Sequence, residues 1–321
     1  MQAITSLPDI CEVYQFAGPR AGEQPTVFIE LPHGATTLAH LDRAKARTRI
    51  YDPRYDSFFL ANTDQGSPEY AHRLARWMTD PEAAATLAGA DDQLAQAYRR
   101  LAEHTRVLVV RALLPRTIVD VNRVWEMNEE QRKQARLTGV HAPFIPEEDL
   151  PGIRQAHRHY NLTAARAYDL VCGSGGHAFN LHTYAPISVN IVEGEHIVDT
   201  LQRAYLPENV GSFPRRPAVE LITAPPEAPS LAPAELVTLL KRSYAEIGIE
   251  AVENDPFPLH PLTSCHDHAQ RHPGKILIME ISRDLLAEPF DPFIEMFIDP
   301  ARVERMTRPI AAAWYRFRAT P

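Results

Sequence analysis

The chain has 321 residues, of which 45% are hydrophobic and 23% are charged, and its formal net charge is −8. These values are ordinary for a globular protein, and the acidic balance disfavours a nucleic-acid partner, because phosphate binding needs clustered lysines and arginines. No run approaches the roughly 18 apolar residues of a membrane span, and the first residues lack the basic and apolar pattern of a signal peptide. The three cysteines are odd in number and widely spaced, so we expect a protein of the reducing cytoplasm.

Strand-like and helix-like segments alternate along the chain. The sequence predicts strands over 26–31, 106–110, 117–121, the segment that holds His182, 217–223, 249–252 and 275–281. It predicts helices over 68–78, 91–103, 129–137, 153–171, 234–247 and 300–317. This alternation indicates a mainly parallel sheet with helices on both faces. The proline-rich connector at 225–233 has candidate site residues on both sides, so we expect one α/β domain over 1–321, with a helical insertion around 124–171.

Four apolar runs, each typical of a buried strand, break into reactive side chains. They span 28–34, 118–123, 179–183 and 276–283. In open α/β sheets, ligands bind outside the carboxyl ends of the strands. His33 follows the first run, and His182 lies in the third. Because a catalytic zinc takes three protein ligands and keeps one position open, the two histidines predict a zinc site at this edge of the sheet.

The third zinc ligand is less well defined by the sequence. Asp52, Asp56 and Asp64 all follow His33, and we favour Asp64 because it precedes the helix expected to pack on the sheet. The same ligand types suit other divalent ions. Glu280 ends an apolar run, and its desolvation would strengthen its tendency to take a proton. It is therefore the predicted general base, which would take a proton from the attacking water and pass it to the leaving amine.

Two arginines and an asparagine predict an anionic substrate. Asn122 and Arg123 follow an apolar run, and arginine offers a planar fork that suits a carboxylate. Arg283 lies just beyond Glu280 and could bind a second carboxylate or orient the glutamate.

A second cluster of metal-binding residue types lies near the C-terminal end. Its members share one short stretch: Cys265, His266, His268 and His272. Such density can indicate a metal site, but the stretch has no apolar periodicity, so we favour an exposed loop. The sequence has no Gly-x-Ser-x-Gly elbow, which disfavours a serine hydrolase, and no Gly-x-Gly-x-x-Gly or P-loop.

Six motifs occur in a particular order along the chain. They are Pro32-His33-Gly34, Thr63-Asp64-Gln65-Gly66, Val119-Asp120-Val121-Asn122-Arg123, Leu181-His182-Thr183-Tyr184, Asn254-Asp255-Pro256-Phe257 and Met279-Glu280-Ile281-Ser282-Arg283-Asp284-Leu285-Leu286. This ordered set resembles the N-formylglutamate amidohydrolase family, which is related to zinc carboxypeptidases and aspartoacylase. The resemblance implies a three-layer α/β/α fold around a mixed, mainly parallel sheet. It also implies zinc-dependent release of formate, or another small acid, from an N-acyl amino acid.

Three segments depart from the family pattern. Asn180 stands where the family has an aspartate before the histidine motif, 258–262 replaces a Gly-Gly loop, and 124–128 adds bulk and a negative charge. All three lie where the substrate is expected, so the acyl group and the amino acid stay open.

The sequence thus predicts a cytoplasmic zinc amidohydrolase, monomeric or a small homo-oligomer, with no nucleic-acid or membrane partner. Its substrate is a small anionic N-acyl amino acid such as N-formylglutamate. The predicted zinc ligands are His33, Asp64 and His182, and the predicted general base is Glu280. The predicted substrate-binding groups are Asn122, Arg123 and Arg283. The alternatives are a zinc deacylase or carboxypeptidase-like hydrolase with another substrate, and a binding protein that keeps the cleft without the metal.

Overall fold

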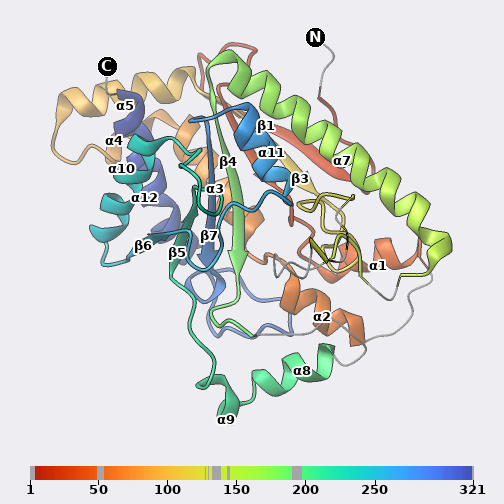
Figure 1. Ribbon diagram of the computed structural model, residues 1–321. Helices are drawn as coiled ribbons and strands as arrows, with labels where there is room; N and C mark the ends of the chain where they lie inside the picture. The colour runs from red at the N-terminus through yellow and green to blue at the C-terminus, as the bar shows by residue number, and fades with distance from the viewer. Residues whose placement is uncertain are drawn as a thin grey trace.

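The computed structural model describes residues 4–48, 54–126, 128, 130–131, 139–142, 145–189 and 197–319 (Figure 1). The strands among these residues form one seven-stranded sheet in the order β1-β3-β2-β4-β7-β5-β6. In chain order they are β1 (Cys11–Ala17), β2 (Val27–Leu31), β3 (Arg106–Ala112), β4 (His177–Tyr184), β5 (Val219–Ile222), β6 (Ala251–Glu253) and β7 (Ile276–Ser282). The central strands β3, β2, β4 and β7 are parallel, whereas β1 and β5 are antiparallel to their neighbours β3 and β7. The sheet is therefore mixed and mainly parallel, as predicted.

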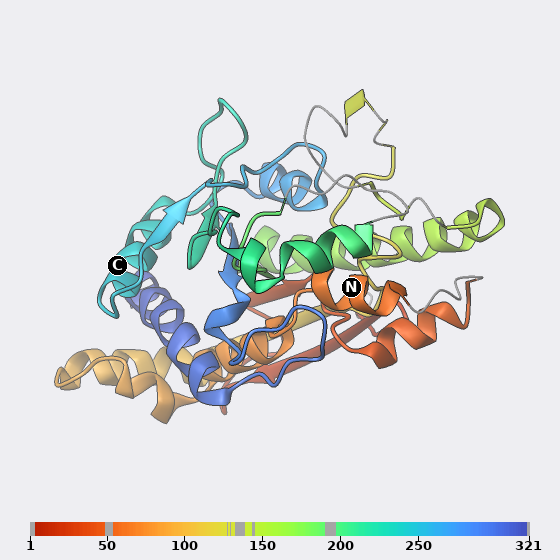
Figure 2. The same ribbon diagram turned by 90° about the horizontal axis from the view of Figure 1, so that it is seen from below.

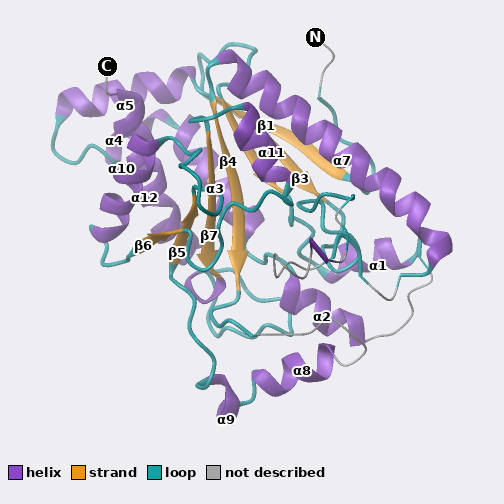
Figure 3. Ribbon diagram, viewed as in Figure 1, coloured by secondary structure: helices purple, strands orange, loops and turns teal. Residues whose placement is uncertain are grey.

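Helices lie on both faces of this sheet (Figure 3). In chain order they are α1 (Leu38–Lys45), α2 (Arg54–Asn62), α3 (Ser67–Thr79), α4 (Pro81–Thr86), α5 (Asp92–His104), α7 (Leu150–Val171), α8 (Ile197–Ala204), α9 (Pro207–Val210), α10 (Ala234–Ala245), α11 (Ser264–Arg271) and α12 (Pro300–Ala319). No helix in the described part of the chain is long and apolar enough to span a bilayer.

The structure has three layers, a sheet between two layers of helices, which Figure 2 shows from below. An apolar core lies on each side of the sheet. One core joins α3, α10 and α12 to Ile29 of β2 and Phe179 of β4. The other joins α7 and α11 to Phe28 of β2 and Ile278 of β7. The predicted three-layer α/β/α fold is thus confirmed.

Strand alternation sets the polarity of the face covered by α7. Side chains of a strand point to opposite faces in turn, and Ile29, Leu181 and Met279 lie in the core on the α3 side. Their neighbours His182 and Glu280 therefore point toward the α7 side, near the ends of β4 and β7. Parallel strands end at the same sheet edge, so reactive side chains gather there.

The predicted strand at 117–121 is wrong. Residues 115–123 form turns, in which the carbonyl of Pro115 accepts hydrogen bonds from the amides of Ile118 and Val119. Ile118 and Val119 pack in a separate cluster with Leu41 and Phe59, whereas Val121 joins the core under α7. The apolar residues of this segment are buried, as their pattern indicates, but a buried apolar run does not by itself define a strand.

The predicted exposed loop around 265–272 is also wrong. This stretch forms α11, whose His266 and His268 are buried. The ring of His268 stacks on Tyr168 of α7 at a centroid distance of 4.3 Å. A helix that buries histidines has no apolar periodicity to reveal it. Most of the predicted helix at 129–137 lies outside the described residues, so the insertion around 124–171 stays a prediction.

Candidate metal centre

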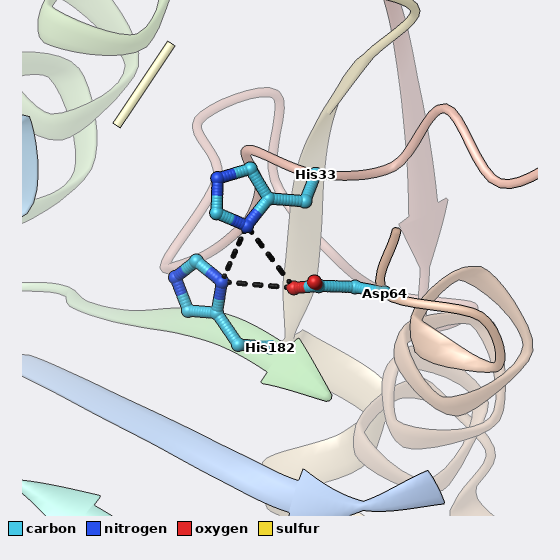
Figure 4. A group of neighbouring side chains, drawn as sticks. All are labelled: His33, Asp64 and His182. Atoms are coloured by element: carbon cyan, nitrogen blue, oxygen red, sulfur yellow. Dashed lines mark hydrogen bonds and ion pairs between the residues drawn. The ribbon is translucent and has the colours of Figure 1, made fainter. Parts of the chain in front are cut away.

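Three buried side chains converge at the carboxyl edge of β2 and β4 (Figure 4). His33 follows β2, His182 lies in β4, and Asp64 lies between α2 and α3. The Nδ1 atoms of the two imidazoles are 3.1 Å apart, and Asp64 Oδ2 lies 3.2 Å from His33 Nδ1 and 3.0 Å from His182 Nδ1. The predicted trio is therefore brought together from segments far apart in the sequence.

The donor set fits one divalent cation. Ligand atoms about 2.0–2.1 Å from a tetrahedral zinc lie roughly 3.3 Å apart, close to the separations found here. In the part of the chain that the structure describes, these three residues form the one group of histidines, cysteines and carboxylates able to hold an ion. The α11 cluster is not such a group. Asp56 instead pairs with Lys45, and Asp52 lies outside the described residues.

Arg283 holds the segment that precedes Asp64 through its terminal nitrogens. Its Nη1 donates to the carbonyls of Leu60 (3.2 Å) and Thr63 (2.9 Å), and its Nη2 donates to that of Ala61 (2.8 Å). The side chain is buried, so these contacts leave its fork turned to the backbone. The contacts show that Arg283 positions the segment of a candidate ligand, and its predicted contact with a substrate carboxylate stays a prediction. Sequence spacing could not show this, because the carbonyls lie over 200 residues away.

Asp120 fixes the ring orientation of His33 and was not predicted to do so. Its Oδ1 lies 2.8 Å from His33 Nε2, and its Oδ2 accepts a hydrogen bond from Arg116 Nε at 3.1 Å. Metal-binding histidines commonly donate their second N–H to a carboxylate, which directs the other nitrogen to the ion. The signal in the sequence was the aspartate that interrupts an apolar run.

The charges of this cluster favour a cation. Burial favours the neutral form of Asp120, but Arg123, His33 and Arg116 outweigh it and hold the carboxyl pKa well below its usual range. Burial likewise opposes ionisation of Asp64, whose pKa is lowered by the charge of His33 and by hydrogen bonds to both histidines. Burial and Arg116 disfavour the protonated His33, yet Asp120 and Asp64 raise its pKa. Two ionised carboxylates thus draw a proton to the imidazole, and a metal ion would displace that proton.

Glu280 lies beside the candidate ligands, on the next strand. It is paired with His182 across β4 and β7 and with Glu220 across β7 and β5. Burial, with smaller contributions from Asp64 and Glu220, raises the pKa of Glu280 to about 8, although His182 and Arg116 oppose the rise. Its Oε2 has no hydrogen-bond partner among the described residues. These are properties of a desolvated carboxylate able to accept a proton.

Glu220 is a second buried carboxylate that the sequence analysis missed. Its Oε1 accepts a hydrogen bond from the amide of Phe257 at 2.7 Å. Burial raises the pKa of Glu220 to about 7. Glu220 lies directly opposite Glu280, and its charge disfavours the ionisation of Glu280.

The loop at 115–123 supplies cationic groups on the β2 side of the site. Arg116 Nη1 lies 3.8 Å from Asp64 Oδ1, and its side chain is 22% exposed, so it can also meet a substrate. Arg123 Nε lies 3.8 Å from Asp120 Oδ2. Asn122 Oδ1 accepts a hydrogen bond from the amide of Cys265 at 3.2 Å, which ties the loop to α11. The predicted Asn122 and Arg123 thus lie near the trio, and Arg116 joins them.

The same loop separates the trio from a nearby cavity. The cavity has a volume of about 410 Å³ and is lined by Ile118 and Val119 together with residues of α1 and α7. The polar side chains of the same loop contact the candidate metal ligands instead: Asp120 contacts His33, and Arg116 contacts Asp64. None of the predicted site residues lines the cavity.

Asn180 belongs to a buried hydrogen-bonded group deeper along the same strands. Its Nδ2 lies 2.6 Å from Oε2 of Glu30, which faces it in register across β2 and β4. The hydroxyls of Tyr168 (2.6 Å) and Tyr160 (3.1 Å) also donate to Glu30. Glu30 of β2 therefore supplies a carboxylate directly opposite Asn180 of β4, the position at which the family pattern has an aspartate.

Comparisons with known proteins identify the fold. No family model matches the sequence, and no curated protein matches it. Among solved structures, the N-formylglutamate amidohydrolase from Ralstonia eutropha JMP134 aligns with a TM-score of 0.55 and 15% identity, over 96% of this chain and 98% of that one. A gene product of Agrobacterium tumefaciens aligns with a TM-score of 0.52 and 12% identity, over 98% of this chain and 100% of that one. The resemblance seen in the ordered motifs is thus confirmed in the fold, which this chain shares with a solved N-formylglutamate amidohydrolase.

Proposed function

We propose that the protein is a metal-dependent amidohydrolase that removes a formyl or other small acyl group from an acidic amino acid such as glutamate. The observation that carries the proposal is the buried trio of His33, Asp64 and His182 with Glu280 on the adjacent strand. Zinc is the metal we propose, because two imidazoles and one carboxylate leave a fourth position open. The solved N-formylglutamate amidohydrolase that shares this fold supports the proposed activity.

Each residue of the site then has a role. A bound zinc would polarise the amide carbonyl and lower the pKa of water. Glu280 takes a proton from the attacking water and delivers it to the leaving nitrogen, which requires the high proton affinity that burial gives it. Arg116 lies beside Asp64 and is positioned to stabilise negative charge on the carbonyl oxygen. Asn122 and Arg123 are the proposed contacts of the α-carboxylate.

Metal analysis and one variant test this proposal. Purified protein should contain about one zinc per chain, and chelation should abolish hydrolysis of N-formyl-L-glutamate until zinc is restored. Glu280→Gln should keep the metal but lower kcat by about 10²- to 10⁴-fold, the usual contribution of a positioned general base. Glu235→Gln, which changes an exposed glutamate of α10, is the matched control. Full turnover by Glu280→Gln would remove that residue from the mechanism.

A substrate panel distinguishes the alternatives. Hydrolysis of N-acetyl or peptide substrates in place of N-formyl ones would identify a deacylase or carboxypeptidase-like enzyme. A protein that binds no metal and hydrolyses none of them would be a binding protein that retains the fold.

A further inference from the structure

The predicted subsite for a second substrate carboxylate has a further candidate residue in the structure. Arg283 was expected to bind a second substrate carboxylate, but its terminal nitrogens donate to backbone carbonyls at 60, 61 and 63. An acidic amino acid would bring two carboxylates into the site. Because these donors of Arg283 are used, a cation on the side of the site opposite Arg116 and Arg123 is a better candidate for the second carboxylate.

Sheet topology brings Arg216 to that side. β5 runs antiparallel to β7, and Val219 of β5 faces Ile281 of β7. The segment that enters β5 therefore lies at the edge where β4 and β7 end. The amide of Arg216 donates to the carbonyl of Pro186, two residues after β4, at 2.9 Å. In the sheet order, β5 lies beyond β7, whereas the loop that bears Arg116 follows β3 on the other side.

Two aromatic rings hold the Arg216 guanidinium. Its central carbon lies 5.3 Å from the ring centroids of both Tyr184 and Phe257. Its Nη1 has one long hydrogen bond, 3.4 Å, to the carbonyl of Ala185. Its buried Nε has no hydrogen-bond partner in the described part of the chain. Aromatic contacts orient a guanidinium without using its N–H donors, so the fork keeps donors for a ligand.

The charges around Arg216 connect it with the metal centre. Burial lowers the pKa of the guanidinium, and Glu280 is the first charged group that opposes this effect. Arg116 acts on Arg216 in the same direction as burial. Both charged groups border the candidate metal ligands. A buried cation with unused donors is favourable for an incoming carboxylate, because a charge-assisted hydrogen bond is strongest where water is excluded.

We propose that Arg216, held between Tyr184 and Phe257, binds the side-chain carboxylate of the substrate. This inference rests on the proposed function and deepens it: the site selects N-acyl amino acids that carry two carboxylates. Asn122 and Arg123 take one carboxylate from the β3 side, and Arg216 takes the other from the β5 side. The amide bond then lies between them, over the metal ligands and Glu280.

The test compares two substrates that differ in one charge. Wild-type protein should hydrolyse N-formyl-L-glutamate with a higher kcat/KM than N-formyl-L-glutamine. Arg216→Met keeps apolar contact with the two rings but removes the donors. It should lower kcat/KM for the glutamate substrate about 10- to 100-fold, mainly through KM, and leave the glutamine substrate nearly unchanged. Arg216→Lys should retain part of the preference. Arg215→Met changes the exposed neighbour, which pairs with Asp284, and should behave as wild type.

The outcomes separate this inference from the proposed function. If Arg216→Met hydrolyses both substrates with the wild-type preference, Arg216 does not bind the side chain although the activity stands. If the wild type hydrolyses neither substrate, calorimetry of zinc-loaded protein with L-glutamate and L-glutamine still tests the subsite. Tighter glutamate binding that is lost in Arg216→Met would support it without the activity. Equal affinities for the two amino acids would overturn it.

Discussion

Placing a second carboxylate opposite Glu30 tests how much the buried hydrogen bond between β2 and β4 contributes to the stability of the fold. In the variant Asn180→Asp, the donor that lies 2.6 Å from Glu30 Oε2 becomes a carboxylate oxygen. Both side chains are buried, and two carboxylates at such a distance do not ionise together. One of them must therefore hold a proton in the folded state at neutral pH, while both are ionised in the unfolded chain.

The free-energy cost follows from proton linkage. A carboxyl group with an unfolded pKa of about 4 that stays protonated in the folded state costs about 4 kcal/mol at pH 7 and roughly 1.4 kcal/mol at pH 5. The folded variant binds one more proton than the unfolded chain, so its stability falls as pH rises. Burial also raises the pKa of Glu30 in the wild type, so the deficit grows by about 1.4 kcal/mol per pH unit over the range in which wild-type Glu30 is ionised.

Urea unfolding at pH 5 and pH 7, with a chelator present, measures this deficit. The double variant Glu30→Gln/Asn180→Asp restores one carboxylate and one amide with their positions exchanged, and it should recover most of the loss. A deficit that does not depend on pH, or a double variant no more stable than the single one, would refute the reasoning.

Two further predictions concern the residues that position the ligands. Asp120→Asn removes the negative charge that faces His33 Nε2 and should weaken zinc binding about 10- to 100-fold in a competition assay with a chromophoric chelator. Asp169→Asn, on the exposed end of α7, should bind zinc as the wild type does; equal affinities of the two variants would contradict the role of Asp120. Arg283→Met leaves three carbonyls beside Asp64 without their donor and should lower the free energy of unfolding by about 3 kcal/mol. The preference for glutamate over glutamine should persist in this variant, and its loss would show that Arg283 binds substrate after all.

The sequence predicts the ligands on strands best. His33 and His182 end or interrupt long apolar runs that are buried on both faces, and parallel topology brings such ends to one edge whatever the loops do. Asp64 is a weaker prediction, because its place depends on a loop held by Arg283 from the far end of the chain. The choice among three aspartates rested on the helix that follows Asp64, and α3 does follow it.

The missed residues share a physical reason. Arg116, Asp120 and Arg216 contact partners that are distant in sequence, and each lies outside the helices and strands. An apolar run at 117–121 was interpreted as a strand because burial in a small side cluster and burial in a sheet require the same residue types. The histidines of α11 were placed in solvent because polar side chains are seldom buried, whereas His268 is buried by stacking on Tyr168.

The wide sequence separation of the candidate ligands also links the lifetime of the fold to the supply of metal. His33 and Asp64 are 31 residues apart, and Asp64 and His182 are 118 apart, so keeping all three on one ion in the unfolded chain costs the entropy of closing two long loops. An ion that binds the folded state alone stabilises it by mass action, by about 4 kcal/mol when its free concentration is a thousand times the dissociation constant. The folded fraction would then follow the free zinc concentration around the protein. A shortage of metal would then lower the amount of folded protein through unfolding and proteolysis, in addition to removing the ion from the site.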